Sequence, residues 1–440
     1  MRTLIRRADV FDGKSTRLRE QVNIVIEDNL IREIVPGDVP AENFEAVYDA
    51  KGYTVIPGLV DAHVHLSWHS TELDRMRVDE VAVRAARVAE IMLLKGFTTV
   101  RDAGGLTYGV KKCIDGGIIP GPRVFPSNAY ISQTCGHGDG RSSRAQSVLP
   151  GDRPISPFLL SGASVIADGV PEMLKAAREQ LFLGASQIKL MAGGGFSSRY
   201  DPIRTLQFSL EEMRAAVGAA EDFGTYVMAH IYTPAAMRRA AQAGVKSFEH
   251  ATFIDEETAR VIQDQGIWIC PCPQFGGEPS EEGAPAPKPP TSKPPNPYDT
   301  EYIEKSRNPE QATELINRFN LPIVFGTDVG FSLEFIAAGQ LKDFRAYKKR
   351  FGSHKGLVSA TGAAHELLKL STSQNPYPQG KIGVLTAGAF ADLLFVRGNP
   401  AEDLAILADR GNIAFIMKDG RVYKDLNTSA RSDSSPDKPQ

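Results

Sequence analysis

The stretch Gly58-Leu59-Val60-Asp61-Ala62-His63-Val64-His65-Leu66 is an apolar run that contains two histidines one residue apart. Side chains of a β-strand alternate with a period of two, so His63 and His65 point to the same side and can hold one metal ion together. Imidazole is the commonest metal ligand in proteins, and one rigid strand presents both rings. A polar strand edge without a metal is the alternative, because eight histidines are spread over the 440 residues. The remaining sequence has to separate these two interpretations.

The composition is that of a globular protein. Hydrophobic residues make up 42% and charged residues 23% of the chain, so we expect a buried core. The formal net charge is −3 and the Lys and Arg residues are dispersed, so neither nucleic acid nor an anionic membrane is expected as a partner. A small-molecule substrate is expected instead. No run of 18 apolar residues occurs and the N-terminus has no long apolar segment, which predicts a soluble, cytoplasmic protein.

The cysteines do not suggest a disulfide framework, since the chain has only four of them. Cys270 and Cys272 share one face of a predicted strand. Zinc-ribbon sites usually have two sets of C-x-x-C pairs, and the sequence has no second set. We therefore expect both cysteines to be core residues.

Strand-like and helix-like segments alternate in the middle of the chain and predict an α/β fold. Helical periodicity, with residues such as Val81, Ala85 and Val88 on one face, separates most of the strand-like runs. Eight strands that alternate with helices are typical of a (β/α)8 barrel of the TIM type. The runs cover residues 59–66, 97–101, 123–131, 187–192, 225–231, 245–250, 267–272 and 322–326.

Both ends of the chain are rich in strands and lack this alternation. Short apolar segments with a period of two predict strands there, without helices between them. These segments cover residues 3–10, 22–34, 47–56, 391–396 and 413–422.

Three segments do not fit either pattern. Residues 136–161 form a long polar loop, and residues 276–300 are dense in Pro, Gly and Ser. Loops of this length are usually lids, binding loops or disordered segments, and for 276–300 a lid and a disordered linker both stay open. Residues 425–440 have the composition of a disordered tail.

Side chains that can bind metals recur at the predicted strand ends, where a barrel carries its active site. Each histidine alone could be a core residue, and Asp328 could cap the following helix. Lys189 is harder to explain structurally, because a charged lysine inside a strand is costly unless it is paired. Six such residues fall on five strands, namely His63, His65, Lys189, His230, His250 and Asp328.

Together these pieces resemble the amidohydrolase superfamily of metal-dependent hydrolases. The matching segments are the Pro57 to His65 stretch and the Gly326-Thr327-Asp328 ending, together with Lys189, His230 and His250. In that family the lysine carries a carbamate derived from CO2, which bridges two divalent metals and replaces a buried cation by an anion. The resemblance implies two ions, with zinc expected. One would be held by His63, His65, Lys189 and Asp328, and the other by Lys189, His230 and His250.

The same resemblance implies the domain organisation. It implies a small composite β-sandwich built from residues 1–57 and 386–424, and a barrel over residues 58–385 that contains the Pro-rich 276–300 loop. Residues 383–392 resemble the segment that returns from the barrel to the sandwich.

Within the superfamily the chain is most similar to the imidazolonepropionase-like branch, which includes X-Pro dipeptidases and ochratoxin-type amidases. The resemblance implies that His137 and Tyr232 bind the substrate, although a loop-stabilising histidine and an amphipathic tyrosine are the alternatives. It also implies a homo-oligomer. The Pro-rich 276–300 loop departs from the pattern of the branch. The matching segments are 98–102, 136–139, 188–195 and 229–233.

The resemblance implies hydrolysis of an amide bond in a small N-acyl amino acid, dipeptide or similar compound by a hydroxide that bridges the metals. Two metal ions depress the pKa of water from 15.7 to roughly 7, and Asp328 can pass the proton to the leaving nitrogen. A urea, carbamate, ester or lactone hydrolase on the same centre is the alternative. Lys189 argues against a deaminase, and the complete ligand set argues against an inactive assembly protein.

Overall fold

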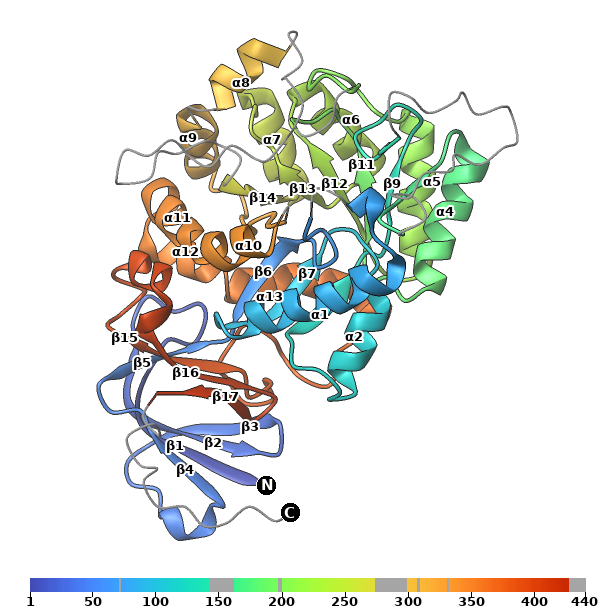
Figure 1. Cartoon of the computed structure of the whole chain (residues 1–440). Helices are drawn as coiled ribbons and strands as arrows, with labels where there is room; N and C mark the ends of the chain where they lie inside the picture. The colour runs from blue at the N-terminus through green and yellow to red at the C-terminus, as the bar shows by residue number, and fades with distance from the viewer. Residues whose placement is uncertain are drawn as a thin grey trace.

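The computed structural model describes residues 1–70, 73–141, 162–196, 200–273, 299–306, 309–330 and 332–426. Parallel sheets flanked by helices form one part of the molecule, and strands from both chain ends form a separate sheet beside it (Figure 1). In the part of the chain that the structure describes, no helix combines the length and the hydropathy that a membrane crossing requires.

Two parallel sheets make up the α/β part. One contains β6 (Leu59–Val64), β7 (Phe97–Asp102) and β8 (Arg123–Pro126), and the other has the order β10-β9-β11-β12-β13-β14. This agrees with the predicted α/β class. The strands of the second sheet are β9 (Tyr130–Ser132), β10 (Ser164–Ile166), β11 (Ile188–Met191), β12 (Val227–Ile231), β13 (Ser247–His250) and β14 (Trp268–Cys270).

The single strand predicted over 123–131 is wrong, because the structure divides it into β8 and β9. The chain turns at Asn128, whose φ of 56° lies in the left-handed region. Its side-chain amide donates hydrogen bonds to the carbonyls of Gln180 at 3.2 Å and Leu183 at 3.3 Å. These bonds hold the turn, so β8 pairs with β7 while β9 pairs with β11 and β10.

The predicted strand over 322–326 is not a regular strand, although the segment lies between β14 and β6. Pro322 has no amide hydrogen to donate, which interrupts a ladder. Within the described residues, the pairing of this segment with β14 is limited to an isolated bridge between Ile323 and Ile269. The backbone N–H of Val324 donates to Ile269 at 2.9 Å, and that of Ala62 donates to Phe325 at 2.8 Å.

Helices cover the sheets with their apolar faces, as the periodicity predicts. Val81, Ala85 and Val88 of α1 (Val78–Leu93) are buried. A capping box at Ser209 begins α5, and Gly266 in the left-handed region ends α7. The other helices are α2 (Tyr108–Asp115), α4 (Val170–Phe182), α5 (Leu210–Asp222), α6 (Pro234–Ala243), α7 (Glu256–Gln265), α8 (Thr300–Ser306), α9 (Glu310–Arg318), α10 (Leu333–Gly339), α11 (Asp343–Phe351), α12 (Ser353–Ser359) and α13 (Gly362–Leu368).

The two chain ends form one sheet with the order β17-β16-β15-β5-β1-β2-β3, and β4 also pairs with β1. The rings of Tyr48 on β4 and Phe415 on β16 lie 5.0 Å apart, although β15 and β5 separate β16 from β1. The sheet therefore curls around a shared core. Its strands are β1 (Arg2–Val10), β2 (Arg19–Glu27), β3 (Leu30–Pro36), β4 (Ala46–Asp49), β5 (Tyr53–Pro57), β15 (Leu393–Arg397), β16 (Ile413–Lys418) and β17 (Arg421–Asp425).

Two strands predicted in this sheet are hairpins. The chain turns at Asp28, with φ of 55°, between β2 and β3, and at Asp419, with φ of 53°, between β16 and β17. Of the predicted tail over 425–440 and the loop over 276–300, residues 427–440 and 276–298 lie outside the described residues. Residues 142–161 of the polar loop lie outside them as well.

A buried arginine connects the curled sheet to the α/β part. Arg123 on β8 is 1% exposed and donates hydrogen bonds to the carboxylates of Asp392 and Asp419. Its guanidinium lies 3.8 Å from the centre of the Phe390 ring. The segment that enters β15 and the turn after β16 are thus tied to a strand of the parallel sheet.

Candidate metal centre

His63 and His65 meet Asp328 at the C-terminal end of β6. The Nε2 atom of His63 lies 3.3 Å from Oδ1 of Asp328, and that of His65 lies 3.2 Å from the same oxygen. The backbone N–H of Asp328 donates to the carbonyl of His63 at 2.7 Å, which ties the segment after residue 326 to the strand. The two rings therefore share one side of the chain, as the period-two spacing predicts.

His230 and His250 complete the cluster from the ends of β12 and β13. Nε2 of His250 lies 3.0 Å from Nδ1 of His230 and 4.0 Å from Oδ2 of Asp328. The ring centres of His63 and His250 are 5.5 Å apart. Five of the six predicted ligands thus contact one another in a chain of pairs, with Asp328 in the middle.

Lys189, the sixth predicted ligand, lies on β11 in register with Met228 of β12 and is 1% exposed. Burial lowers its pKa, while the charges of Glu249 and Asp328 act in the opposite direction. Among the described residues, no hydrogen bond or ion pair engages its Nζ. Its charge is within electrostatic reach of His63, His230 and His250.

The protonation states of His230, His250 and Asp328 suit metal binding, whereas His63 binds a proton in place of a metal. Burial lowers the pKa of His250 to about 3, and burial together with His137 and His250 lowers the pKa of His230 well below its ordinary value. Burial raises the pKa of Asp328, but the charges and hydrogen bonds of His63 and His65 outweigh it and hold that pKa well below its ordinary value. Burial and the charge of Lys189 lower the pKa of His63, but the charge and hydrogen bond of Asp328 outweigh them and raise that pKa to about 10, so a metal ion would displace a proton from this ring. Neutral imidazoles and an ionised carboxylate are the donors that zinc prefers, so the residues fit the implied ions once His63 has lost that proton.

Three buried charged residues support this cluster and were not predicted from the sequence. Glu249 accepts a hydrogen bond from Nδ1 of His63 at 2.7 Å and is paired with Arg101 at 2.9 Å. Asp61 accepts from Thr327 Oγ1 at 2.7 Å, which fastens the Asp328 segment to β6. The cost of burying a charge in a strand, which singled out Lys189, would also have singled out all three.

The two predicted substrate-binding residues border the cluster. The ring of His137 stacks on His230 with centres 4.0 Å apart, and its Nδ1 lies 2.9 Å from a carboxylate oxygen of Asp201. The ring of Tyr232 stacks on His250 with centres 4.8 Å apart. Gly195 allows this arrangement, because a Cβ atom at that position would collide with the His137 ring.

Aromatic side chains extend from Tyr232 away from the histidines. The ring of Phe196 lies 4.9 Å from that of Tyr232, and the rings of Phe253 and Tyr302 are 5.0 Å apart. On the other side, the ring of Trp68 packs edge-on against His65 at 5.3 Å. These rings, which were not predicted, place apolar surface beside the polar cluster.

Cys270 and Cys272 are buried, as predicted, with their sulfur atoms 3.7 Å apart. Together with His63 and Glu249 they form a second group whose possible donor atoms lie within 4.8 Å of one another. Burial raises the pKa of Cys272 well above its ordinary value, so its thiol is a poor ligand, and Arg101 already neutralises Glu249. We therefore regard this group as support for His63.

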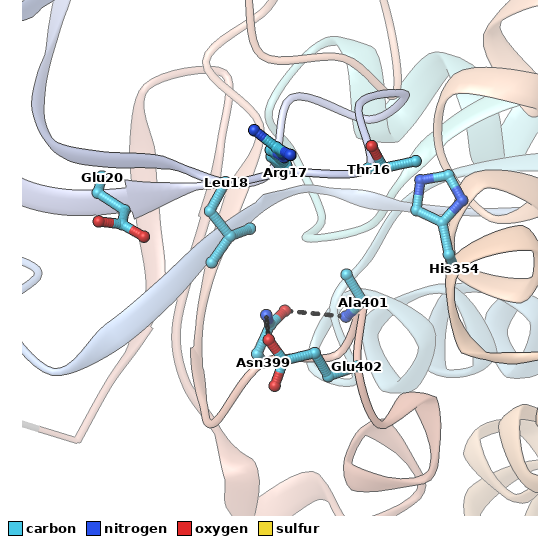
Figure 2. A pocket seen from close by; sticks show the side chains of 8 residues that line it. All are labelled: Thr16, Arg17, Leu18, Glu20, His354, Asn399, Ala401 and Glu402. Carbon is cyan, nitrogen blue, oxygen red and sulfur yellow. Dashed lines mark hydrogen bonds between the residues drawn. The ribbon is translucent and has the colours of Figure 1, made fainter.

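A cavity of about 440 Å³ lies elsewhere, between the loop that leads into β2 and the segment after β15 (Figure 2). Arg17, Glu20, His354 and Glu402 are among the residues that line it. None of the clustered histidines does so. The cavity is therefore separate from the candidate metal centre.

Comparisons with known proteins place the chain in a family. It matches the Amidohydrolase family over residues 54–423. It is 28% identical over 442 residues to the ochratoxinase of Aspergillus niger, covering 96% of this chain and 86% of the relative. A prolidase structure in complex with N-methylphosphonate-L-proline has a TM-score of 0.84 and 32% identity, and the match covers 97% of this chain and 100% of that one.

A second solved structure, of a Xaa-Pro dipeptidase with methionine bound in its active site, has a TM-score of 0.80 and 29% identity. The match covers 96% of this chain and 100% of that one. The resemblance to X-Pro dipeptidases and ochratoxin-type amidases is thereby confirmed. The chain belongs to the amidohydrolase family and is a hydrolase that acts on carbon–nitrogen bonds.

Proposed function

We propose that this hydrolase binds two divalent metal ions, with zinc expected, and cleaves an amide bond in a small N-acyl amino acid or dipeptide. The observation that carries the proposal is the convergence of four histidines and Asp328, with the buried Lys189 within electrostatic reach of them. The relatives named ochratoxinase, prolidase and Xaa-Pro dipeptidase support an amide or peptide substrate. We also propose that the two parallel sheets and the 322–326 segment complete a (β/α)8 barrel, with the composite unit over residues 1–57 and 386–424.

The six clustered residues divide between two ions in this proposal. His63, His65 and Asp328 would hold one ion, His230 and His250 the other, and Lys189 would serve both. Burial lowers the pKa of Lys189, so its amine is more often neutral and can attack CO2. An N–C bond would form while one C=O π bond of CO2 opens, and the proton lost from the nitrogen would pass to solvent. The resulting carbamate replaces a buried cation by an anion that can bridge two metals.

Bound metal ions would lower the pKa of a water molecule and polarise the scissile carbonyl. The protein supplies the proton transfer. The Asp328 carboxylate is ionised, because its pKa is held well below the ordinary value. It can accept a proton from the attacking water and deliver it to the leaving nitrogen, which must be protonated to depart as an amine.

Substrate orientation would come from His137 and Tyr232. Both rings stack on proposed ligands, so a carbonyl or carboxylate group beside the metals would lie within their reach. Phe196 and Phe253 offer apolar surface to an uncharged part of the substrate. A homo-oligomeric state and a cytoplasmic location stay predictions from the sequence.

The first test is a substrate panel of X-Pro dipeptides, N-acyl amino acids, aryl amides, phenylureas and lactones, followed by mass spectrometry. Ureas and lactones are included because the same centre could cleave them. We expect the wild type to cleave one class, and Lys189→Ala to lower that rate more than about 100-fold because it removes a shared ligand. Lys175→Ala, an exposed lysine on α4, is the matched control. Equal rates for wild type and Lys189→Ala would refute the proposed centre.

A further inference from the structure

The Nδ1 atoms of His63 and His65 contact hydrogen-bond acceptors of different charge. Nδ1 of His63 lies 2.7 Å from Oε2 of Glu249, whereas Nδ1 of His65 lies 2.9 Å from the backbone carbonyl of Gly104. In both rings this leaves Nε2 facing Asp328. Nδ1 of His63 therefore faces a carboxylate, and Nδ1 of His65 faces a neutral carbonyl.

Glu249 is ionised although it is completely buried. Arg101 donates to both of its carboxylate oxygens, at 2.9 and 3.1 Å, and the hydroxyl of Ser247 donates at 2.7 Å. The guanidinium of Arg101 places a full positive charge beside both carboxylate oxygens, and this paired geometry favours the ionised form of Glu249. An ionised carboxylate only accepts hydrogen bonds, so Nδ1 of His63 must carry the hydrogen.

Arg101 is itself held in place on several sides. Its guanidinium donates to the carbonyl of Ala62 at 2.6 Å, to the hydroxyl of Tyr226 at 3.1 Å and to that of Ser247 at 3.2 Å. These partners lie on or next to β6, β12 and β13, so neither Arg101 nor Glu249 can turn away without breaking several buried bonds. Arg101 on β7 and Glu249 on β13 thus help to orient the His63 ring, in addition to its own contact with Asp328.

We propose that Glu249 is a positioning residue that keeps the hydrogen of His63 on Nδ1 and, through its charge, makes Nε2 a stronger metal donor than Nε2 of His65. The inference rests on the proposed metal centre. A carboxylate that accepts from the outer nitrogen of a histidine raises the basicity of the inner nitrogen, and the loss of such a partner typically weakens metal affinity about 10–100-fold. A neutral carbonyl, such as the one that faces His65, raises the basicity of the inner nitrogen less.

The informative variant is Glu249→Gln, because Arg101 has five donors and no acceptor. The new amide must turn its oxygen toward Arg101, so its nitrogen faces Nδ1 of His63 and donates to it. This bond stabilises the tautomer with the hydrogen on Nε2, which cannot bind a metal. The size and shape of the side chain are nearly unchanged.

The matched control is Asp392→Asn, which also neutralises a buried carboxylate paired with a buried arginine but lies away from the histidines. Co²⁺ affinity is measured by competition with a chelator, and the exchangeable imidazole N–H signals of the Co²⁺ protein are recorded by NMR. We expect Glu249→Gln to bind Co²⁺ about 10–100-fold more weakly than both wild type and Asp392→Asn, and to lose the slowly exchanging Nδ1–H signal of His63. A purely structural role for Glu249 would lower stability without removing that signal.

Equal Co²⁺ affinity of Glu249→Gln and Asp392→Asn would overturn the positioning role while leaving the proposed centre intact. A wild-type protein that binds no Co²⁺ would overturn both proposals. If Glu249→Gln does not fold, the wild-type Co²⁺ spectrum still decides, because the absence of an Nδ1–H signal from His63 would contradict the proposal.

Discussion

Two buried arginines on neighbouring paired strands have opposite roles in this molecule. Arg101 on β7 and Arg123 on β8 are 0% and 1% exposed, and each is paired with a buried carboxylate. Arg101 binds Glu249, which contacts His63 in the candidate metal centre. Arg123 binds Asp392, which leads into the curled sheet. The residue type and its burial are the same, so the position of the partner decides whether an arginine serves the centre or the assembly of the two parts.

Stability alone cannot distinguish these two pairs. Removing one member of a buried ion pair usually costs about 3–5 kcal/mol, because the remaining charge is left uncompensated, whereas replacing both members by apolar residues is often neutral. Metal retention separates them, since only the Arg101 pair contacts a proposed ligand. The predictions below use both measurements.

Arg101→Met should have the largest effect. We expect the free energy of unfolding in urea to fall by about 3–5 kcal/mol, because Glu249 loses its counter-charge, and we expect metal to be lost from the folded protein. Metal content is measured on the folded fraction after gel filtration. Full metal retention in a destabilised Arg101→Met protein would show that the pair is only structural.

Arg123→Met should destabilise the protein by a similar or slightly smaller amount, about 3–4 kcal/mol. The loss is limited because Asp392 still accepts a hydrogen bond from the backbone N–H of Asp419 at 2.8 Å. The folded fraction should keep the metal content and the amide turnover of the wild type. A fall in the metal affinity of Arg123→Met would contradict the conclusion that only the Arg101 pair supports the metal centre.

The double variant Arg123→Met with Asp392→Leu controls for this result. It removes both charges of the pair, so most of the lost stability should return. The corresponding Arg101→Met with Glu249→Leu should regain stability and yet bind metal weakly. Recovery of metal binding in that second double variant would contradict the role of Glu249.

Lys14→Ala tests a second connection between the curled sheet and the α/β part, and its effect should be the smallest. Lys14 Nζ lies 2.7 Å from Glu366 on α13, but the two side chains are 53% and 39% exposed. We expect a loss of about 0.2–1 kcal/mol in thermal or urea unfolding, as for exposed ion pairs generally. A loss as large as that of Arg123→Met would show that burial does not set the magnitude.

The pH dependence of unfolding gives a second test of the ion pair between Lys14 and Glu366. Hydrogen bonds from Lys14 and then Lys369 lower the pKa of Glu366 from 4.5 to about 2. A carboxyl with a lowered pKa stabilises the fold above its ordinary pKa, and this contribution disappears as the pH falls through the folded value. The difference between wild type and Lys14→Ala should therefore be constant above pH 4.5 and vanish near pH 2.

The positions of the proposed ligands could be predicted because ligand chemistry is visible in residue type and in the period of a strand. His63, His65, His230, His250 and Asp328 meet as expected. The acceptors behind the rings could not be predicted, since Glu249 is 186 positions from His63 and the carbonyl of Gly104 has no sequence signature. The tertiary structure, not the local sequence, brings such acceptors next to the histidine rings.

The strand boundaries also depend in part on contacts with distant segments, which the local sequence does not reveal. The apolar run over 123–131 carries no glycine or proline between the two strands that it forms, apart from Pro126 at the end of β8. Its break at Asn128 depends on carbonyls at the end of α4, more than 50 positions away. For the curled sheet, only the family resemblance implied that the two chain ends join, because the pairing of β5 with β15 connects distant segments that share no local sequence pattern.

That pairing also determines how the protein can be made in a cell. Strand β5 pairs with β1 near the start of the chain, but its other neighbour, β15, is synthesised only after the whole α/β part. Until the ribosome has released residues 393–397, a growing chain exposes the edge of β5, and bare strand edges pair readily with other chains. Slow translation, or a stop codon before the sequence of β15, should therefore favour inclusion bodies. The yield of intact enzyme should rise when more chaperone is available during translation.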